Sequence, residues 1–195
     1  MSGDVQKLNQ NSFGFYVGLI HYPVINRRAE LVTSSVTNLD IHDIARASRT
    51  FGVKGYFIIH PSEDQQALNR RIINHWGGDF AMRANPTRKD ALNLVQLVYS
   101  IEEALTVIER QEAKPFIIGT SAKASAQTPE ISISELKTKM KERPVVLLFG
   151  TAYGLAPEWT DRLDAFLPPI QGPSDFNHLS VRSAATIYLD RIFGR

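Results

Sequence analysis

Three stretches of the chain gather residue types that can do chemistry. The first, residues 38–53, places carboxylates, an imidazole and guanidinium groups close together: Asp40, His42, Asp43, Arg46 and Arg49. Carboxylates and imidazoles can move protons, and guanidinium groups bind anions. Asp40 is predicted to cap a helix that begins near Ile41, with Asp43 in the first turn, where the helix dipole favours negative charge. A capped surface helix with an Asp43–Arg46 ion pair explains the same spacing, so the spacing alone leaves both interpretations open.

The other two stretches follow predicted strands. Gly150 and Gly154 come after the apolar run 145–149, where glycine lets a backbone approach a ligand closely or simply permits a turn. The third stretch, residues 167–185, is rich in Pro and Gly and leads through Asn177 into a helix that Ser180 can cap. An ordinary buried terminal helix explains this pattern. Its start would nonetheless lie beside strand-end loops, where it could touch a ligand.

The elements that must position these stretches are predicted by alternating apolar runs and helical patterns. Several of the strand-like runs are apolar on both faces, which is typical of parallel strands covered by helices on both sides. These runs are Phe15–Ile20, Gly55–His60, Leu94–Tyr99, Pro115–Gly119 and Val145–Phe149. Helices are predicted over Ile101–Gln111 and Ser180–Phe193, and after the capping-box pairs Ser62/Gln65, Ser100/Glu103 and Ser132/Glu135. We therefore predict an α/β fold, a mainly parallel open sheet with helices on both faces.

Ligands of open α/β sheets bind outside the carboxyl ends of the strands. In this chain those ends are residues 118–121, 149–155 and 167–172, so we expect the site there. We also expect a flexible tail over residues 1–12 and a single domain over residues 13–195.

Composition excludes several classes of protein. The chain has 195 residues, of which 43% are hydrophobic and 22% charged, as in ordinary globular proteins. It holds no cysteine, which excludes disulfides, thiolate metal sites and cysteine nucleophiles. The formal net charge of +2 is too small to indicate a nucleic-acid binder by itself. No apolar run approaches the roughly 18 residues of a membrane span, and the start lacks the layout of a signal peptide, so we expect a cytoplasmic protein.

Several common motifs are absent from the sequence. There is no Gly-x-x-x-x-Gly-Lys-Ser/Thr, no Gly-x-Gly-x-x-Gly after a strand and no Gly-x-Ser-x-Gly. The five histidines are scattered without a His-Glu-x-x-His pair, so we predict no metal site.

Taken together and in order, the three stretches resemble the motifs of the SPOUT (α/β-knot) RNA methyltransferases. The first resembles Asn-x-x-Asn-Ile-x-Arg-x-x-x-x-x-Gly, with matches at Asp40, Asp43, Ile44, Arg46 and Gly52 and aspartates in place of both asparagines. The second resembles Phe-Gly-x-x-x-x-Gly-Leu over residues 149–155, one residue shorter and without the acid common in that loop. The third is similar to an Ile-Pro-like strand followed by Leu-Asn-Val-x-x-Ala-Ala, over residues 167–170 and 179–185, with Ser180 in place of asparagine. The whole resembles the bacterial stand-alone, uncharacterised members of that superfamily.

The resemblance implies a deep trefoil knot in the C-terminal part and a homodimer with its substrate site at the subunit interface. It also implies S-adenosylmethionine (SAM) as cofactor, bound largely by backbone groups of three loops. Carried over by position, the cofactor-binding residues are Gly119, Thr120, Phe149, Gly150, Gly154, Leu155, Leu167, Ile170, Asn177 and Leu179.

The implied activity is methyl transfer from SAM to a nucleotide of tRNA or rRNA. By motif position Arg46 would orient the target nucleotide, and Asp40 would act as the base or orient the acceptor, ahead of His42. Arg182 would approach the cofactor or the RNA from the terminal helix.

RNA contacts are expected from local basic residues: Arg27, Arg28, Arg46, Arg49, Arg83, Arg88 and Lys89. The run Lys137, Lys139, Lys141 and Arg143 fits a solvated helix face better. Two other functions stay open: a knotted module that binds SAM or RNA without transferring a methyl group, and a nucleotide-binding α/β protein such as a flavodoxin-like domain.

Overall fold

A six-stranded parallel sheet organises the part of the chain that the structure describes. The computed structural model describes residues 13–76, 78, 85–122 and 128–195, so the predicted tail and Arg83 lie outside the described residues. The strand order is β5-β4-β1-β7-β6-β8, and every pairing in it is parallel. In chain order the strands are β1 (Phe15–Ile20), β4 (Gly55–Ile59), β5 (Val95–Val98), β6 (Phe116–Gly119), β7 (Val145–Gly150) and β8 (Ala165–Phe166). The predicted mainly parallel α/β fold is confirmed.

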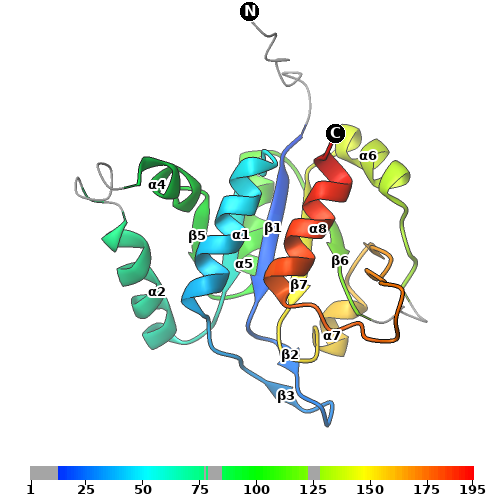
Figure 1. Cartoon of the computed structure of the whole chain (residues 1–195), viewed down its shortest axis with the longest axis horizontal. Helices are drawn as coiled ribbons and strands as arrows, with labels where there is room; N and C mark the ends of the chain where they lie inside the picture. The colour runs from blue at the N-terminus through cyan, green and yellow to red at the C-terminus, as the bar shows by residue number, and fades with distance from the viewer. Residues whose placement is uncertain (1–12, 77, 79–84, 123–127) are drawn as a thin grey trace, which may run out of the picture.

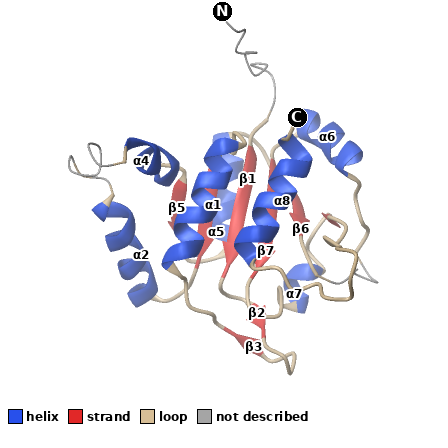
Figure 2. Cartoon of the chain, in the orientation of Figure 1, coloured by secondary structure: helices blue, strands red, loops and turns tan. Residues whose placement is uncertain are grey.

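Helices cover both faces of the sheet (Figures 1 and 2). Strand side chains alternate between two apolar cores, so that Val145 and Leu147 face one layer while Val146 and Leu148 face the other. The first layer contains α1 (Asn38–Thr50), α8 (Val181–Phe193), α2 (Glu63–His75), α4 (Pro86–Leu92) and α6 (Ile133–Glu142). The second contains α5 (Ile101–Gln111) and α7 (Pro157–Thr160). Because both faces are covered, the central strands are apolar throughout, as their sequences predict.

The start of α1 differs from the prediction. The helix begins at Asn38, and its cap is Thr37, whose hydroxyl accepts a hydrogen bond from the Asp40 amide at 3.2 Å. Asp40 stands three residues later and completes a capping box by accepting from the Thr37 amide. Asp40 is therefore not the cap that the sequence predicted, because Thr37 offers an equally good capping group one turn earlier.

The other predicted caps have mixed outcomes. Ser132 and Glu135 form the complete capping box, and Ser100 caps α5, although Glu103 accepts from the Tyr99 amide instead of Ser100. Ser62 caps α2 without a side-chain cap bond, and the other half of the predicted box is absent because the Ser62 amide donates to His60 while Gln65 accepts from the Val36 amide.

A small hairpin lies below the carboxyl ends of the strands in Figure 1, formed by β2 (Val24–Ile25) and β3 (Leu31–Val32). The sequence did not predict it, because two-residue strands leave no periodic pattern. Among the described residues, no helix is long and apolar enough to cross a membrane.

Candidate active site

The loops that follow β6, β7 and β8 lie side by side at one edge of the sheet. Their strands are neighbours, and the Leu167 amide donates to the Gly119 carbonyl at 3.0 Å while the Thr120 amide donates to Leu148 at 3.2 Å. The Asn177 side chain then links the third loop to the first, because its amide donates to the Ala122 carbonyl at 2.7 Å. The structure therefore brings together the three strand ends where the sequence placed the ligand site.

Close backbone packing explains the glycines of these loops. A Cβ on Gly150 would lie 2.7 Å from the Leu155 amide nitrogen, and Gly154 has a φ of +112°, which disfavours other residues. A Cβ on Gly119 would collide with Leu163. The glycines are thus needed by the fold of the loops themselves, and they leave backbone groups at the surface of the site.

The predicted cofactor residues differ in exposure. The side chains of Phe149, Leu155 and Leu167 belong to the apolar cores, so only their backbone groups are available to a ligand. The half-buried members are Thr120, Gly150, Gly154, Ile170 and Asn177, while Leu179 is exposed.

Tyr188 holds the third loop to α8. Its hydroxyl donates to the Pro168 carbonyl at 2.9 Å. Burial raises the pKa of Tyr188 to about 12, so the hydroxyl keeps its proton and its hydrogen bond at neutral pH.

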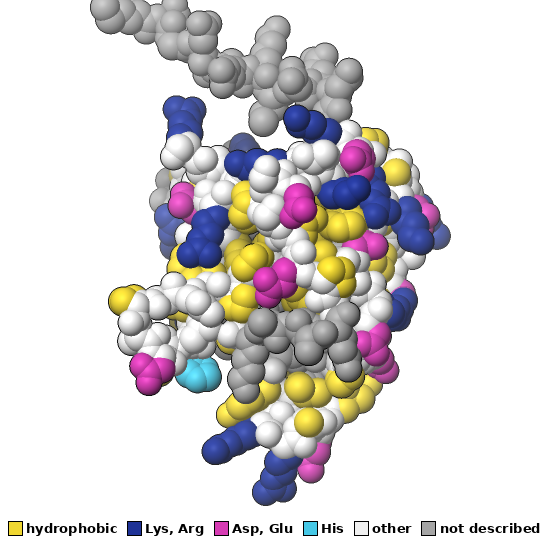
Figure 3. Space-filling model, turned by 90° about the vertical axis from the view of Figure 1, so that its right-hand side faces the viewer, with side chains coloured by type: hydrophobic (Ala, Val, Ile, Leu, Met, Phe, Trp, Pro, Cys, Tyr) yellow, Lys and Arg dark blue, Asp and Glu magenta, His cyan; other side chains and the backbone are white. Residues whose placement is uncertain are grey.

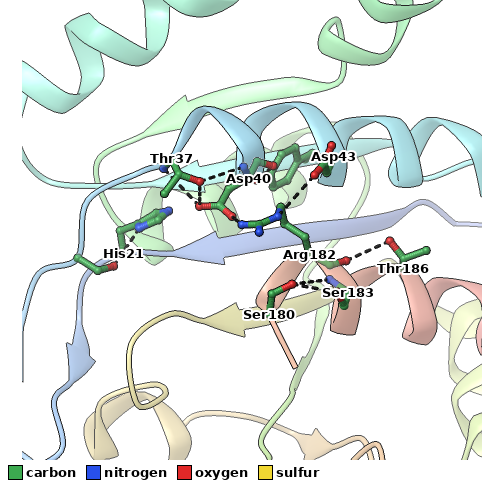
Figure 4. Close-up of polar contacts among 10 residues, drawn as sticks. His21, Thr37, Asp40, Asp43, Ser180, Arg182, Ser183 and Thr186 are labelled. Atoms are coloured by element: carbon green, nitrogen blue, oxygen red, sulfur yellow. Dashed lines mark hydrogen bonds and ion pairs between the residues drawn. The ribbon is translucent and has the colours of Figure 1, made fainter. Parts of the chain in front are cut away.

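An ion pair joins the first turns of α1 and α8, and both of its members are predicted site residues (Figure 4). Arg182 donates to Asp40 at 2.8 Å and lies 3.5 Å from a carboxylate oxygen of Asp43. The second oxygen of Asp40 accepts from the Thr37 hydroxyl at 2.6 Å, and the Asp40 side chain is only 6% exposed. With both oxygens engaged, Asp40 is placed to hold the two helices together.

The other two predicted residues of α1 lie further along the helix. Arg46 is exposed, and it forms no ion pair with any residue in the described parts of the chain. His42 packs edge-on against Trp76, with 5.8 Å between ring centroids. Burial lowers the pKa of His42, the cations Arg88 and Arg46 lower it further, and Asp43 opposes them, so the imidazole is neutral at pH 7.

A buried polar chain at the end of β1 was missed by the sequence analysis. His21 is 1% exposed, and its Nδ1 lies 2.9 Å from the Ser34 hydroxyl, which in turn contacts the hydroxyl of Thr151. Thr151 donates to the Ile20 carbonyl at 2.9 Å. Each hydroxyl can donate only once, so Thr151 donates to Ile20, Ser34 donates to Thr151, and the proton of neutral His21 is on Nδ1. Nε2 of His21 has no hydrogen-bond partner among the residues that the structure describes. The available signal was a histidine directly after a buried strand that ends at the site.

Among the described residues, no group of three or more His, Cys, Asp or Glu side chains could hold a metal ion.

Comparison with protein families gives one match that covers nearly the whole chain. A family described as "SAM-dependent RNA methyltransferase" matches residues 14–194. A "tRNA (guanine-N(1)-)-methyltransferase" of Oleidesulfovibrio alaskensis is 46% identical over 180 residues, which are 92% of this chain and 42% of that protein. A protein of the same name from Nitratidesulfovibrio vulgaris is 40% identical over 187 residues, 95% of this chain and 43% of that protein.

This chain thus spans less than half the length of these two curated relatives, whose names describe the longer proteins. A relative of similar length is an uncharacterised protein of Aquifex aeolicus, 35% identical over 189 residues that make up 96% of this chain and 91% of that protein.

Solved structures share the fold at low sequence identity. A putative methylase family protein from Neisseria gonorrhoeae has a TM-score of 0.60 at 18% identity, over 94% of this chain and 83% of that chain. The SpoU methyltransferase AviRb from Streptomyces viridochromogenes, solved with AdoMet, has a TM-score of 0.58 at 15% identity, over 94% of this chain and 60% of that chain. The likeness to both is one of fold.

Proposed function

Because this chain belongs to the family of SAM-dependent RNA methyltransferases, we propose that it transfers a methyl group from SAM to a nucleotide of tRNA or rRNA. The observation that carries this proposal is the family match over residues 14–194, which includes all three strand-end loops. The names of two relatives favour tRNA.

SAM would be held where the loops after β6, β7 and β8 meet. The loops fit such a ligand because their glycines bring backbone groups together without side chains in the way, as at Gly150. We assign the binding to Gly119, Thr120, Phe149, Gly150, Gly154, Leu155, Leu167, Ile170, Asn177 and Leu179, with the buried members acting through their backbones. When bound, SAM supplies a methyl group on a sulfonium that leaves as a neutral thioether.

The protein's task is then to hold the acceptor in line with the methyl group. Arg46, exposed and unpaired among the described residues, orients the target nucleotide through its phosphate or a base edge. Asp40 and Arg182 set the distance between α1 and the loop that precedes α8. Neutral His42 is able to take a proton from the acceptor.

The proposal includes a homodimer. Exposed apolar side chains lie near the starts of α1 and α8, at Leu39, Phe176 and Leu179, and support a homodimer formed through this end of the molecule. We further propose that residues 13–195 act as one domain, that its C-terminal part is knotted, and that the protein works in the cytoplasm.

The test is transfer of a labelled methyl group from SAM to bulk tRNA and, separately, to rRNA. Wild-type protein should label tRNA, and Arg46→Ala should lower kcat/KM by about tenfold or more, the size of one lost charge-assisted hydrogen bond. Arg110→Ala, an exposed position on the opposite face of the sheet, should leave kcat/KM unchanged. If neither tRNA nor rRNA is labelled, the proposal is refuted.

A module that binds SAM or RNA without transfer is the second candidate. The engagement of Asp40 with Arg182 and Thr37 favours it, because it leaves His42 as the only one of the two predicted bases, Asp40 and His42, that has no ion-pair partner among the described residues. This function would be identified if calorimetry shows that the protein binds S-adenosylhomocysteine while no methyl group is transferred to tRNA or rRNA.

A further inference from the structure

The β2–β3 hairpin is fixed to the loop after β7, which belongs to the proposed cofactor site. The Ile25 amide donates to the Gly154 carbonyl and the Tyr153 amide donates to the Ile25 carbonyl, both at 3.0 Å. The Ala156 amide donates to the Pro23 carbonyl at 3.2 Å, and Val24 pairs antiparallel with Leu155. We call residues 22–34 the β2–β3 arm. These bonds hold the arm at a fixed distance from the cofactor loop.

The base of the arm is held by the buried polar chain described above. The Ser34 amide donates to the His21 carbonyl at 2.9 Å, which closes the arm where it leaves and rejoins the fold. The Ser34 hydroxyl contacts both His21 and Thr151, so the same residue fastens the arm to the end of β7.

The tip of the arm presents two adjacent arginines. Asn26 shapes the turn, because its side-chain oxygen accepts from the amides of Arg28 at 2.8 Å and Glu30 at 3.1 Å. The side-chain nitrogen of Asn26 also donates to the Glu30 carboxylate at 2.7 Å. Arg27 and Arg28 are exposed and form no ion pair within the described residues. Figure 3 shows basic side chains extending from the lower end of the molecule, where Figure 1 places the hairpin.

An exposed aromatic ring lies next to the arm. Tyr153 is 65% exposed, and its backbone is hydrogen-bonded to Ile25, two residues before Arg27. It follows Ala152, whose φ of +53° marks a sharp turn of the chain. A basic group beside an exposed ring is the combination that binds unpaired nucleic acid, since phosphates contact the cation and a base stacks on the ring.

We propose that the β2–β3 arm binds an unpaired stretch of the RNA substrate. Arg27 and Arg28 contact its phosphates, and one of its bases stacks on Tyr153. The arm thereby delivers RNA to the adjacent cofactor loop. An unpaired strand fits, because a nucleotide must leave its stack before its atoms can reach a cofactor held between loops. This inference rests on the proposed RNA methyltransferase function.

The test measures how the affinity for a fluorescent oligouridylate depends on salt. Removing two phosphate contacts, by Arg27→Ala with Arg28→Ala, should make the slope of log affinity against log salt shallower by about 1.4. Tyr153→Ala should weaken binding by about tenfold and leave the slope unchanged. The matched control is Lys137→Ala with Lys141→Ala on α6, which removes the same charge from an exposed helix face and should keep the wild-type slope.

Calorimetry with S-adenosylhomocysteine is run on every variant, and wild-type affinity shows that the cofactor loops are intact. A wild-type slope in the double arginine variant, or no binding of oligouridylate by the wild type, overturns the role of the arm. If arm-dependent RNA binding is found without methyl transfer to tRNA or rRNA, the proposed function fails and the arm stands. If methyl transfer is found and its KM is unchanged in the arm variants, the arm fails and the proposed function stands.

Discussion

The Asp40–Arg182 ion pair shows how one contact can set the geometry between two helices. Asp40 is almost wholly removed from water, and a buried carboxylate requires a partner that neutralises it. Arg182 meets this need while lying near Asp43, so the first turn of α8 is aligned with the first turn of α1. Because α1 carries Arg46 and α8 begins where the third loop ends, the pair connects the helix that we propose to orient the acceptor with the loop that we propose to bind the cofactor.

Arg182→Met should therefore reduce both stability and cofactor affinity. Leaving Asp40 buried without its partner should lower the free energy of unfolding by about 2–3 kcal/mol, somewhat less than for a fully buried pair because Arg182 is 29% exposed. Urea unfolding measures this loss, and calorimetry measures S-adenosylhomocysteine affinity. Combining Arg182→Met with Asp40→Asn should restore part of the stability, since the charge left unpaired is removed. Arg191→Met, exposed at the far end of α8, is the control. A double variant as unstable as the sum of its two single variants would contradict the argument.

The loop after β7 is folded so tightly that it has no room for a side chain at Gly150. A Cβ there would meet the Leu155 amide nitrogen at 2.7 Å and the Gly154 carbonyl carbon at 2.9 Å. These are backbone atoms, which cannot move aside by changing a rotamer. The loop would have to change its path, and the arm bonded to it would move as well.

Gly150→Ala should thus weaken S-adenosylhomocysteine binding by tenfold or more and lower the free energy of unfolding by about 1–3 kcal/mol. Gly172→Ala is a matched control, because no atom of the described residues lies within 4 Å of the position that its Cβ would occupy. Calorimetry and thermal unfolding of the two variants give the comparison. Wild-type affinity in Gly150→Ala would show that this loop does not bind the cofactor.

The strands of the sheet could be predicted because burial on both faces leaves an apolar run in the sequence. Phe15–Ile20 is found with the predicted bounds, and the other predicted strands differ by about one residue at an end. Short elements leave no such run, so β2, β3, α4 and α7 were missed. The third stretch was expected to contain a strand at residues 167–170, but the strand β8 ends at Phe166.

The convergence of the three strand-end loops was predicted, but the contacts around them were not, and the roles of the site residues remain predictions. A parallel sheet puts its strand ends at one edge, so the convergence of the three loops follows from the fold. The partner of Asp40 does not follow, since 142 positions separate Asp40 from Arg182 along the chain. The link from His21 through Ser34 to Thr151 depends on the hairpin, which left no pattern in the sequence.

Over the whole molecule, the charges nearly cancel, with 22 basic and 20 acidic residues. A net charge of +2 gives little long-range attraction for RNA, so the proposed RNA binding would depend on places where cations are unpaired among the described residues, such as the arm tip. Other cations have acidic partners: Arg49 binds Asp90, Lys54 binds Glu112 and Arg162 binds Glu102. The RNA contact expected of Arg49 stays a prediction.

The same molecule should lose stability in weak acid because it buries neutral histidines. Burial lowers the pKa of His21 from 6.5 to about 4, with His60 adding to this effect and Asp40 and Ser34 opposing it. The unfolded chain therefore binds this proton at higher pH than the folded chain. The contribution of His21 is fully present above pH 6.5 and is lost as the pH falls toward 4, by roughly 3 kcal/mol. Burial lowers the pKa of His42 and His60 in the same direction.

His21→Asn separates this effect from general acid denaturation. Asparagine keeps a donor for Ser34 but does not titrate, so the variant should be less stable at pH 7 and lose less stability between pH 6.5 and 4 than the wild type. Glu102 and Glu112 act at lower pH. Burial raises their pKa values, but their hydrogen bonds and the nearby cations Arg162 and Lys54 together outweigh burial and lower both pKa values. Urea unfolding across this pH range is the measurement, with the exposed His178→Asn as control. An unchanged pH dependence in His21→Asn would mean that His21 is not the group that titrates, because the two states would then bind the same number of protons there.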